Sequence, residues 1–235
     1  MNKNFLTLLA VAFVAVGSST TASAQSVVGV DLSRTWTGYM NVFENSGGSK
    51  GAYVFGSGWA VSDLKSTLNV GAGSILLQPN FNAYENNPGD AFWRNNGGAG
   101  PLGNKWMDAN TFTEYGSVFS GSLTFTGAVS AYSLSPDYTA TAFIRALDPN
   151  AGYATVVEST DVLSATGSFS VGADLSASQP SWIIQTGFQM SGINANPANV
   201  VALGSVTVVP EPSTYALLAL GGLGLGAHLL RRRRA

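Results

Sequence analysis

The stretch Gly121-Ser-Leu-Thr-Phe-Thr-Gly-Ala-Val129 alternates apolar residues with small polar ones. Leu123 and Phe125 can face one side of an extended chain, and Val129 joins them if the alternation slips at Gly127. The other side would then carry Ser122, Thr124, Thr126 and Ala128. A period of two is typical of a strand that buries one face. The stretch therefore predicts a β-strand packed on a hydrophobic core.

The rest of the region between residues 25 and 208 repeats this kind of pattern. Short extended runs, separated by Gly, Asn, Ser and Pro, occupy residues 37–44, 51–61, 73–79, 138–148, 166–173, 182–190 and 202–208. No long stretch has the 3.6-residue period of a helix, and no internal repeat is evident. The pattern predicts an all-β fold, a single β-sandwich of about eight to ten strands with jelly-roll connectivity.

Side-chain direction can be predicted for two of these runs. In the run 138–148, Phe143 and Leu147 share one face of the strand with Arg145 between them. Because an unpaired buried charge is costly, Arg145 should lie near a sheet edge or beside a partner. The same argument directs three side chains of the run 182–190 toward the core: Trp182, Ile184 and Phe188.

The composition argues against several classes of function. The chain has no Cys, one His and 10% charged residues. The single His, His228, lies near the C-terminus, so the region 25–209 lacks the side chains for Ser-His-Asp or Cys-His catalysis and for His-based zinc sites. That region holds six basic and twelve acidic residues, a net charge of −6. Binding to phosphate backbones needs concentrated positive charge, so no nucleic-acid partner is expected.

The N-terminus has the order of features found in a secretory signal peptide. Lys3 supplies a positive charge, and an apolar run follows from Phe5 to Val16. Ala22-Ser23-Ala24 gives the small-x-small cleavage pattern. We therefore expect residues 1–24 to be a signal peptide, with cleavage before Gln25.

The C-terminus predicts a membrane-spanning helix. The apolar run from Tyr215 to Leu230 would be about 24 Å long as a helix, against about 30 Å for the hydrocarbon core of a bilayer. Ser213 and Thr214 can lengthen this helix, and the arginines after it can reach the headgroups. Basic residues stay in the cytoplasm, so the domain before the helix would lie outside.

The tail resembles the PEP-CTERM sorting signal over residues 209–235. Seven residues carry the resemblance on either side of the apolar run: Pro210, Glu211, Pro212, Arg231, Arg232, Arg233 and Arg234. The resemblance implies that the partner is an exosortase-like transpeptidase of a Gram-negative bacterium that makes exopolysaccharide. It also implies an exported precursor anchored in the inner membrane, which then becomes a cell-surface or extracellular-matrix protein. The expected organisation is therefore a signal peptide at residues 1–24, a β-sandwich domain at 25–208 and the sorting signal at 209–235.

The segment from Gln78 to Gly116 differs from the rest, because it is dense in Asn, Gly and aromatic residues. Its composition is typical of a long loop, and loops on a rigid scaffold often carry function. One interpretation is a carbohydrate-binding face, in which aromatic rings stack on sugars and polar side chains bind hydroxyls. The residues of that face would be Tyr84, Trp93, Arg94, Trp106 and Tyr115. The other interpretation is that these aromatic residues close one end of the sandwich and only pack.

The same segment holds oxygen ligands of the kind that calcium takes. They are Asn80, Asn82, Glu85, Asn87 and Asp90. Their spacing matches no EF-hand loop, and Asn-rich turns are common without a metal. Bound calcium is one alternative, and no other cofactor is expected.

Three functions remain open for the central domain. The first is a surface or matrix protein without enzymatic activity. The second is a carbohydrate-binding module for exopolysaccharide or environmental glycan. The third is a glycoside hydrolase, which needs two carboxylates about 5 to 10 Å apart. The carboxylates available to it in the loop-like segment are Glu85, Asp90, Asp108 and Glu114.

Overall fold

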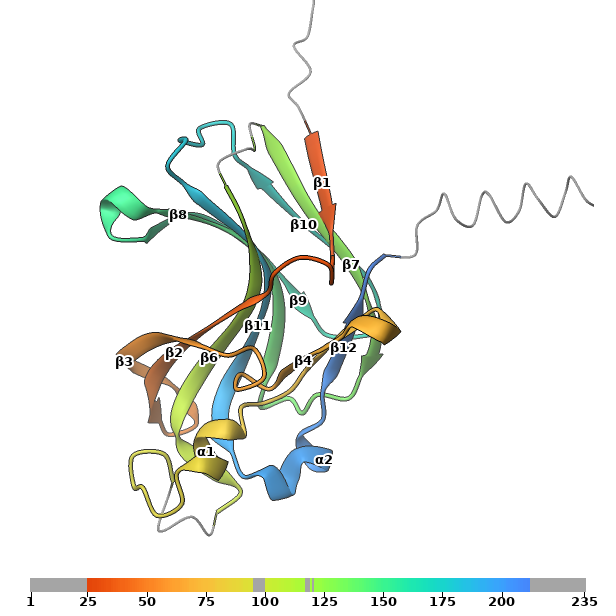
Figure 1. Cartoon of the computed structure of the whole chain (residues 1–235). Helices are drawn as coiled ribbons and strands as arrows, with labels where there is room; N and C mark the ends of the chain where they lie inside the picture. Colours follow the sequence, from red (N-terminus) through yellow and green to blue (C-terminus); the bar gives the residue numbers. More distant parts are fainter. Residues whose placement is uncertain (1–24, 95–99, 117–118, 120, 212–235) are drawn as a thin grey trace, which may run out of the picture.

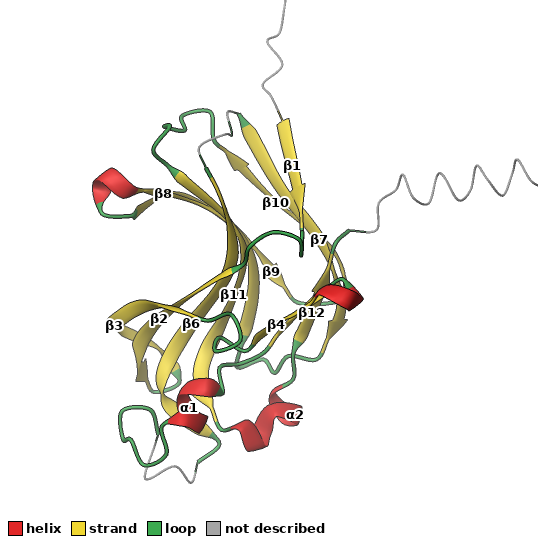
Figure 2. Ribbon diagram, in the orientation of Figure 1, coloured by secondary structure: helices red, strands yellow, loops and turns green. Residues whose placement is uncertain are grey.

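The computed structural model describes residues 25–94, 100–116, 119 and 121–211. These residues form two β-sheets with a few short helical turns (Figures 1 and 2). The two sheets pack on each other, and the all-β sandwich predicted from the sequence is confirmed. The jelly-roll connectivity stays a prediction.

The first sheet, called sheet A, runs in the order β1-β7-β12-β5-β4, and β10 also pairs with β7. Its strands are β1 (Gln25–Gly29), β4 (Ser66–Asn69), β5 (Ser74–Leu77), β7 (Ser122–Tyr132), β10 (Gly167–Asp174) and β12 (Val206–Val209). β1 runs parallel to β7, and the other pairs are antiparallel.

The second sheet, called sheet B, runs in the order β3-β2-β6-β11-β8-β9 and is antiparallel throughout. Its strands are β2 (Thr37–Ser46), β3 (Ser49–Trp59), β6 (Leu102–Tyr115), β8 (Thr139–Asp148), β9 (Ala154–Leu163) and β11 (Ile183–Ala195). In Figure 1 these strands bend, and the β2–β3 and β8–β9 hairpins reach outward on the side away from sheet A.

The helical elements in the described residues are one turn or little more. They are α1 (Asn82–Asn86), α2 (Val200–Leu203) and the 3-10 turns η1 (Val70–Ala72), η3 (Pro149–Ala151) and η4 (Pro197–Asn199). None of the helices in the part of the chain that the structure covers is long and apolar enough to span a bilayer. The predicted signal peptide and the predicted C-terminal helix lie outside the described residues.

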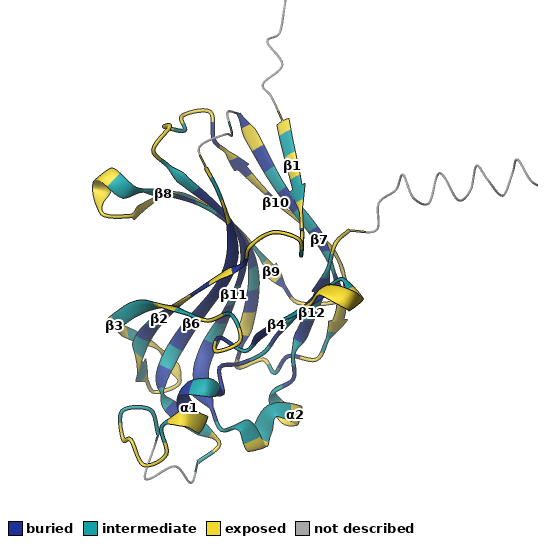
Figure 3. Cartoon of the chain, in the orientation of Figure 1, coloured by how far each residue is buried: buried dark blue, intermediate teal, exposed yellow. Residues whose placement is uncertain are grey.

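The core lies between the two sheets, where Figure 3 shows the buried residues gathered. At its centre, the Phe188 ring of β11 lies 5.5 Å from the Phe125 ring of β7 and 5.8 Å from the Phe169 ring of β10. Trp36 stacks on the same Phe188 ring at 6.1 Å. Aromatic contacts therefore join the two sheets. Ile184 and Phe188 are fully buried and Trp182 packs against the core, as the sequence predicts.

In β7 the alternation of buried and more exposed residues continues through Gly127 without a slip. Leu123, Phe125 and Val129 are buried with regular alternation, and Gly127 faces the core with them. A Cβ atom at Gly127 would lie 2.6 Å from the Phe169 ring and 2.9 Å from Val30. The glycine is therefore an uninterrupted part of the strand, because neighbouring side chains already fill its place in the core.

The prediction of a long loop over residues 78–116 is wrong for its second half. Residues 102–115 form β6, a central strand of sheet B between β2 and β11. The alternation of apolar and polar residues that marks a strand is weak there, because both faces of β6 carry polar groups. On the core side Thr111 donates a hydrogen bond to Ser66, and on the outer side Asp108 and Asn110 are buried. The strands β1, β4 and β9 also escape the sequence pattern.

Candidate functional site

A cleft of about 630 Å³ crosses the outer face of sheet B, on the side away from sheet A. It touches all six strands of that sheet. Its walls and floor are Thr37, Gly38, Tyr39, Asn41, Gly58, Asn110, Phe112, Glu114, Arg145, Leu147, Gly152, Tyr153, Thr155, Ile183 and Gln185. The volume falls within the range of about 300–1,000 Å³ that is common for ligand sites.

Strand register places three polar groups of the cleft and the neighbouring Glu158 in one row across the sheet. Gln185 lies opposite Glu114 on one side and opposite Arg145 on the other, and Arg145 lies opposite Glu158. The Gln185 amide donates a 2.9 Å hydrogen bond to Glu114. Arg145 donates through Nε and Nη2 to one oxygen of Glu158, at 3.0 and 2.7 Å. Arg145 thus has a partner on the edge strand β9, as its sequence position predicts.

An apolar row lies beside this polar row. Phe112 and Phe143 both pair with Gly187, one from each side, and both rings are buried although they belong to the outer face. A Cβ atom at Gly187 would clash with the Thr111 carbonyl oxygen and lie 2.6 Å from the Cα and Cβ atoms of Phe112. The glycine therefore leaves room for the β6 backbone at this pair. The Arg145 guanidinium lies 4.6 Å from the centre of the Phe143 ring, so the polar and apolar rows support each other.

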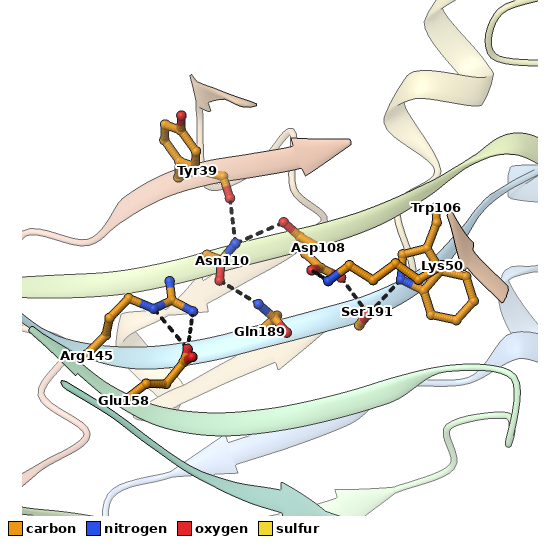
Figure 4. Close-up of polar contacts among 9 residues, drawn as sticks. All are labelled: Tyr39, Lys50, Trp106, Asp108, Asn110, Arg145, Glu158, Gln189 and Ser191. Carbon is orange, nitrogen blue, oxygen red and sulfur yellow. Dashed lines mark hydrogen bonds and ion pairs between the residues drawn. The ribbon is translucent and has the colours of Figure 1, made fainter. Parts of the chain in front are cut away.

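A further group of polar contacts lies on the outer face of sheet B near the β2–β3 hairpin (Figure 4). Asp108, which is 3% exposed, accepts hydrogen bonds from Lys50 and Ser191, each at 2.6 Å. The Trp106 indole donates to Ser191 at 2.9 Å. The Asn110 amide donates to the carbonyl groups of Tyr39 and Asp108. Figure 4 shows these side chains lying along one surface of the sheet.

One further contact continues the amide series into the next strand. Gln189 of β11 donates to the Asn110 side-chain oxygen at 2.9 Å. The outer face of sheet B thus holds its amides in fixed orientations, which is the arrangement that pre-organises a polar site.

Tyrosines stand at both sides of this cleft. Tyr39 on β2 is 38% exposed, and Tyr153 in the β8–β9 hairpin is 62% exposed. Tyr153 has a positive φ of 63°, an unusual conformation for a residue with a side chain. Strands lie about 4.8 Å apart, so β2 and β9 are separated by roughly 19 Å along the sheet. Within the described residues, neither phenol donates or accepts a hydrogen bond to the protein.

Gly56 on β3 lets three polar groups approach one another. A Cβ atom there would lie 2.7 Å from the Asn41 side-chain oxygen and 2.8 Å from the hydroxyls of both Tyr39 and Tyr53. The side chain of Asn41, like those tyrosines, has no hydrogen bond to the described residues. These groups are therefore able to bind a ligand without breaking a contact of the fold.

A second hollow of about 500 Å³ adjoins the cleft and shares two residues with it, Thr37 and Glu114. Ser33, Arg34 and Thr35 form the rest of its lining. The Arg34 guanidinium lies 4.0 Å from the centre of the Tyr115 ring and donates to the Glu114 carbonyl oxygen. Arg34 is thus held by the fold at the border of the cleft.

The residues predicted to form a carbohydrate-binding face do not come together on one surface. Tyr84 is buried and donates to the Gly100 carbonyl, and the Arg94 guanidinium lies 4.3 Å from the Tyr84 ring. Trp93 packs on the core side of sheet B against Phe55 and Trp59. The remaining two residues of the predicted face are Trp106 and Tyr115.

Trp106 lies on the outer face of sheet B, on the opposite side from Trp93. Tyr115 packs against the core at the end of β6. Only Trp106 of the predicted set therefore belongs to the outer face. None of the five predicted residues lines the cleft, although Asn110, Phe112 and Glu114 of the same segment do.

The oxygen atoms predicted to bind calcium have partners within the protein. Asn80 accepts from the Ala83 amide, Asn82 accepts from Asn86, and Asp90 accepts from the Phe92 amide. Glu85 lies 3.7 Å from Lys65, and the Asn87 amide donates to the Ala83 carbonyl. A search of the described residues for three or more grouped Asp, Glu, His or Cys side chains finds none. Calcium at these residues stays a prediction.

Two carboxylates that the sequence offers for glycoside hydrolysis, Asp108 and Glu114, do lie on the outer face of β6. They are six residues apart on one strand, which is about 20 Å. This separation is larger than the roughly 5 to 10 Å between the two carboxylates of a glycosidase. Glu85 and Asp90 lie in and after α1, outside the cleft.

Sequence reasoning named Glu114 on β6 as a candidate carboxylate and missed the other cleft residues on β2, β6 and β11. The run 37–44 contained a usable signal, because Tyr39, Asn41 and Phe43 alternate with the buried Met40 and Val42. Aromatic and amide side chains on the exposed face of a strand are candidates for ligand contacts. No comparable signal in the sequence places Gln185 or Tyr153 beside them, since that depends on strand order.

The tail can be compared with known families. The family model of the PEP-CTERM protein-sorting motif matches residues 208–234. The tail carries a PEP-CTERM sorting motif. This confirms the resemblance drawn from Pro210-Glu211-Pro212 and the four arginines, and it concerns the tail alone. A search of curated proteins finds no match to the chain.

One solved structure similar to this chain is that of carbohydrate-binding modules from the β-sandwich superfamily, whose specificity is described as promiscuous. The sequences are 12% identical, and the TM-score is 0.35. The match covers 75% of this chain and 55% of that chain, so this chain spans about half the length of the protein it matches. The function proposed for the cleft does not rest on that likeness.

Proposed function

We propose that the domain binds carbohydrate in the cleft across sheet B and has no enzymatic activity. The observation that carries this proposal is a floor of oriented amides between two exposed tyrosines. Asn41 and Gln185 offer donors and acceptors for sugar hydroxyls, and Asn110 offers the remaining lone pair of its side-chain oxygen. Tyr39 and Tyr153 offer flat rings for sugar C–H faces. Ligand sites commonly combine apolar or aromatic walls with a few placed polar groups.

Pre-organisation supports this proposal in energetic terms. The Asn110 and Gln185 side chains are already fixed by hydrogen bonds to their neighbours, so little side-chain entropy is lost when a ligand binds. A sugar hydroxyl can replace water at the remaining lone pairs and N–H groups of these amides. The cleft can thus bind a polar ligand through neutral amides, while its charged residues Glu114 and Arg145 are held by Gln185 and Glu158.

We also propose that the chain is exported and anchored by its PEP-CTERM tail before an exosortase-like enzyme processes it. It then becomes part of the cell surface or extracellular matrix, where exopolysaccharide is a ligand within reach. Replacing the four arginines at 231–234 with Ser should leave the precursor unprocessed. The mass and location of the mature protein, measured in a host with the sorting enzyme, decide this point. An unchanged mature mass would contradict it.

The binding proposal is tested with Tyr39→Ala and Tyr153→Ala in the full chain, kept in solution with a mild detergent. Each should weaken binding to a polysaccharide about tenfold, equivalent to roughly 1.4 kcal/mol, without lowering the melting temperature. Affinity electrophoresis in gels that contain single polysaccharides gives the measurement. The control is Val201→Ala, which removes part of a side chain that is 92% exposed on α2, away from the cleft.

The same samples test the absence of catalysis. Incubating a bound polysaccharide with the parent protein should release no reducing ends. Release that disappears in Glu114→Gln would mean that the domain is a hydrolase.

A further inference from the structure

The cleft reaches both edges of sheet B. Its lining begins at Gly58 on the edge strand β3 and ends at Thr155 on the edge strand β9. Five strand spacings of about 4.8 Å separate these edges, roughly 24 Å measured along the sheet. The long axis of the cleft therefore runs across the strands from edge to edge.

The end of the cleft at β3 has no wall. Gly58 pairs with Tyr39, so a side chain at this position would stand on the cleft face. Among the described residues, the only heavy atom within 4 Å of a Cβ built there is the Gly38 carbonyl oxygen, at 4.0 Å. A ligand that lies over Tyr39 can thus continue past the edge of the sheet into solvent.

Two basic residues on the outer face of sheet B form ion pairs within the protein. Arg145 is the basic residue among those that line the cleft, and its guanidinium is held by both bonds to Glu158. Lys50 lies on the same face and is paired with Asp108 at 2.6 Å. Glu114 is the acidic lining residue, and its partner is the neutral amide of Gln185. Arg34 at the border of the cleft donates to the Glu114 carbonyl oxygen and lies on the Tyr115 ring. An anionic ligand would meet the Glu114 carboxylate, which has no ion pair within the described residues, and would find Arg145 and Lys50 already paired.

At the other end of the cleft, Gly152 and Thr155 are exposed, and among the described residues no heavy atom lies within 4 Å of a Cβ atom built at Gly152. From the two open ends and the internal ion pairs we infer that the cleft binds an internal stretch of an uncharged polysaccharide. The chain would cross all six strands of sheet B and leave at both edges, so neither terminus is recognised. This inference rests on the proposed function, and it adds the ligand's charge and the part of the chain that is bound.

The first experiment titrates the full chain, in detergent, with uncharged polysaccharides: dextran, a soluble mixed-linkage β-glucan, xylan and galactomannan. Alginate and polygalacturonate are the anionic probes. Calorimetry on size-fractionated chains should give several protein molecules per polysaccharide chain, rising in proportion to chain length. A stoichiometry fixed at one per chain would overturn the inference and leave the proposed function standing.

The second experiment blocks the open end at β3 with Gly58→Ile. A β-branched residue suits a strand and offers no flat ring for a sugar. It should weaken polysaccharide binding at least tenfold and should change the affinity for a trisaccharide of the same polymer less than twofold. The matched control is Gly172→Ile on β10, a strand glycine with nothing within 4 Å of its Cβ position. The control should leave both affinities unchanged.

Each remaining outcome is decisive. If Gly58→Ile binds the polymer as the parent does, the cleft does not continue past β3 and the inference is wrong. If alginate or polygalacturonate binds more tightly than every uncharged polymer, the ligand is anionic and the inference is wrong, although carbohydrate binding holds. If the parent binds none of the polymers, the proposed function and the inference both fail.

Discussion

The two outer faces of the sandwich differ in how their polar side chains are held. On sheet A, the outer face carries small hydroxyl residues, among them Thr124 and Thr126 on β7 and Ser168 and Ser170 on β10. Within the described residues, no hydrogen bond links these hydroxyls to one another. On sheet B, most of the side chains drawn in Figure 4, among them Asp108 and Glu158, are held by hydrogen bonds and ion pairs, and several of them are buried.

The difference shows on which sheet the fold orders its polar side chains at a cost in free energy. Small hydroxyls that face water lose little on folding, and they need no partner. Buried amides and carboxylates cost free energy unless they are hydrogen-bonded, so each of them must be placed by its neighbours. Polar groups that a fold could have left out, but that it holds in fixed positions, are expected at a functional surface. Sheet B holds its outer polar groups in this way, as the proposed binding function requires, while the outer face of sheet A carries small hydroxyl residues.

The largest expected effect comes from a substitution in the core between the two sheets. Phe188→Ala should destabilise the domain by about 3–5 kcal/mol, because the fully buried ring contacts aromatic residues from both sheets. Chemical unfolding followed by Trp fluorescence measures the loss. Val201→Ala should stay within about 0.5 kcal/mol of the parent. An unchanged unfolding midpoint for Phe188→Ala would contradict the packing described for β11.

The next effect breaks the ordered face alone. Asp108→Ala removes the carboxylate that accepts from Lys50 and Ser191, and it should cost about 2 kcal/mol. The matched change Asp63→Ala removes an exposed carboxylate from the loop after β3 and should cost less than about 0.5 kcal/mol. Equal losses in the two variants would show that the contacts around Asp108 do not stabilise sheet B.

A smaller effect separates the two outer faces directly. Gln185→Ala should cost about 1 kcal/mol, because it deletes one hydrogen bond at a buried position, and it should also weaken polysaccharide binding. Ser170→Ala on sheet A should change neither stability nor binding. Thermal melts and affinity electrophoresis of the pair give the comparison. If Ser170→Ala weakens binding and Gln185→Ala does not, the ligand binds on sheet A.

The smallest effect concerns pH at the end of sheet A. The backbone N–H of Ser176, followed by its hydroxyl, hydrogen-bonds the Asp174 carboxylate and lowers the pKa of that group below its usual value. A lowered pKa means that the carboxylate contributes stability above the unfolded pKa of about 3.9, and that this contribution is lost as the pH falls below it. NMR titration of the Asp174 carboxyl should give a midpoint below 3.9. A midpoint above it would show that the Ser176 contacts are absent in solution.

The sequence predicts the sandwich better than the site. Strands such as β7 and β10 have one apolar and one small polar face, and their period of two is visible without any structure. β6 lacks that contrast, because Thr111 and Thr113 face the core while Asp108 and Asn110 are buried on the outer side. The buried polar residues of β6 are thus the ones that weaken the alternating pattern by which a strand is predicted from sequence.

The candidate site also depends on strand order, which local patterns do not encode. Glu114, Gln185, Arg145 and Glu158 form a row only because β6, β11, β8 and β9 are neighbours in sheet B. The aromatic residues of the segment 78–116 are conspicuous in the sequence, yet Tyr84 and Trp93 serve the packing of the fold. Aromatic density alone therefore does not separate a binding face from a packed end.

The short strand β12 has a mechanical consequence. It ends at Val209, and the sorting motif begins at Pro210, so no spacer separates the sandwich from its tether. β12 is bonded to β5 on one side and to β7 on the other, and Val206 and Val208 are fully buried. Because antiparallel hydrogen bonds lie perpendicular to the strands, a load along β12 shears them together, whereas a sideways load unzips them in turn. If the tail anchors the domain and the cleft binds a polymer as proposed, resistance to drag on that polymer is set by the direction in which a four-residue strand is pulled.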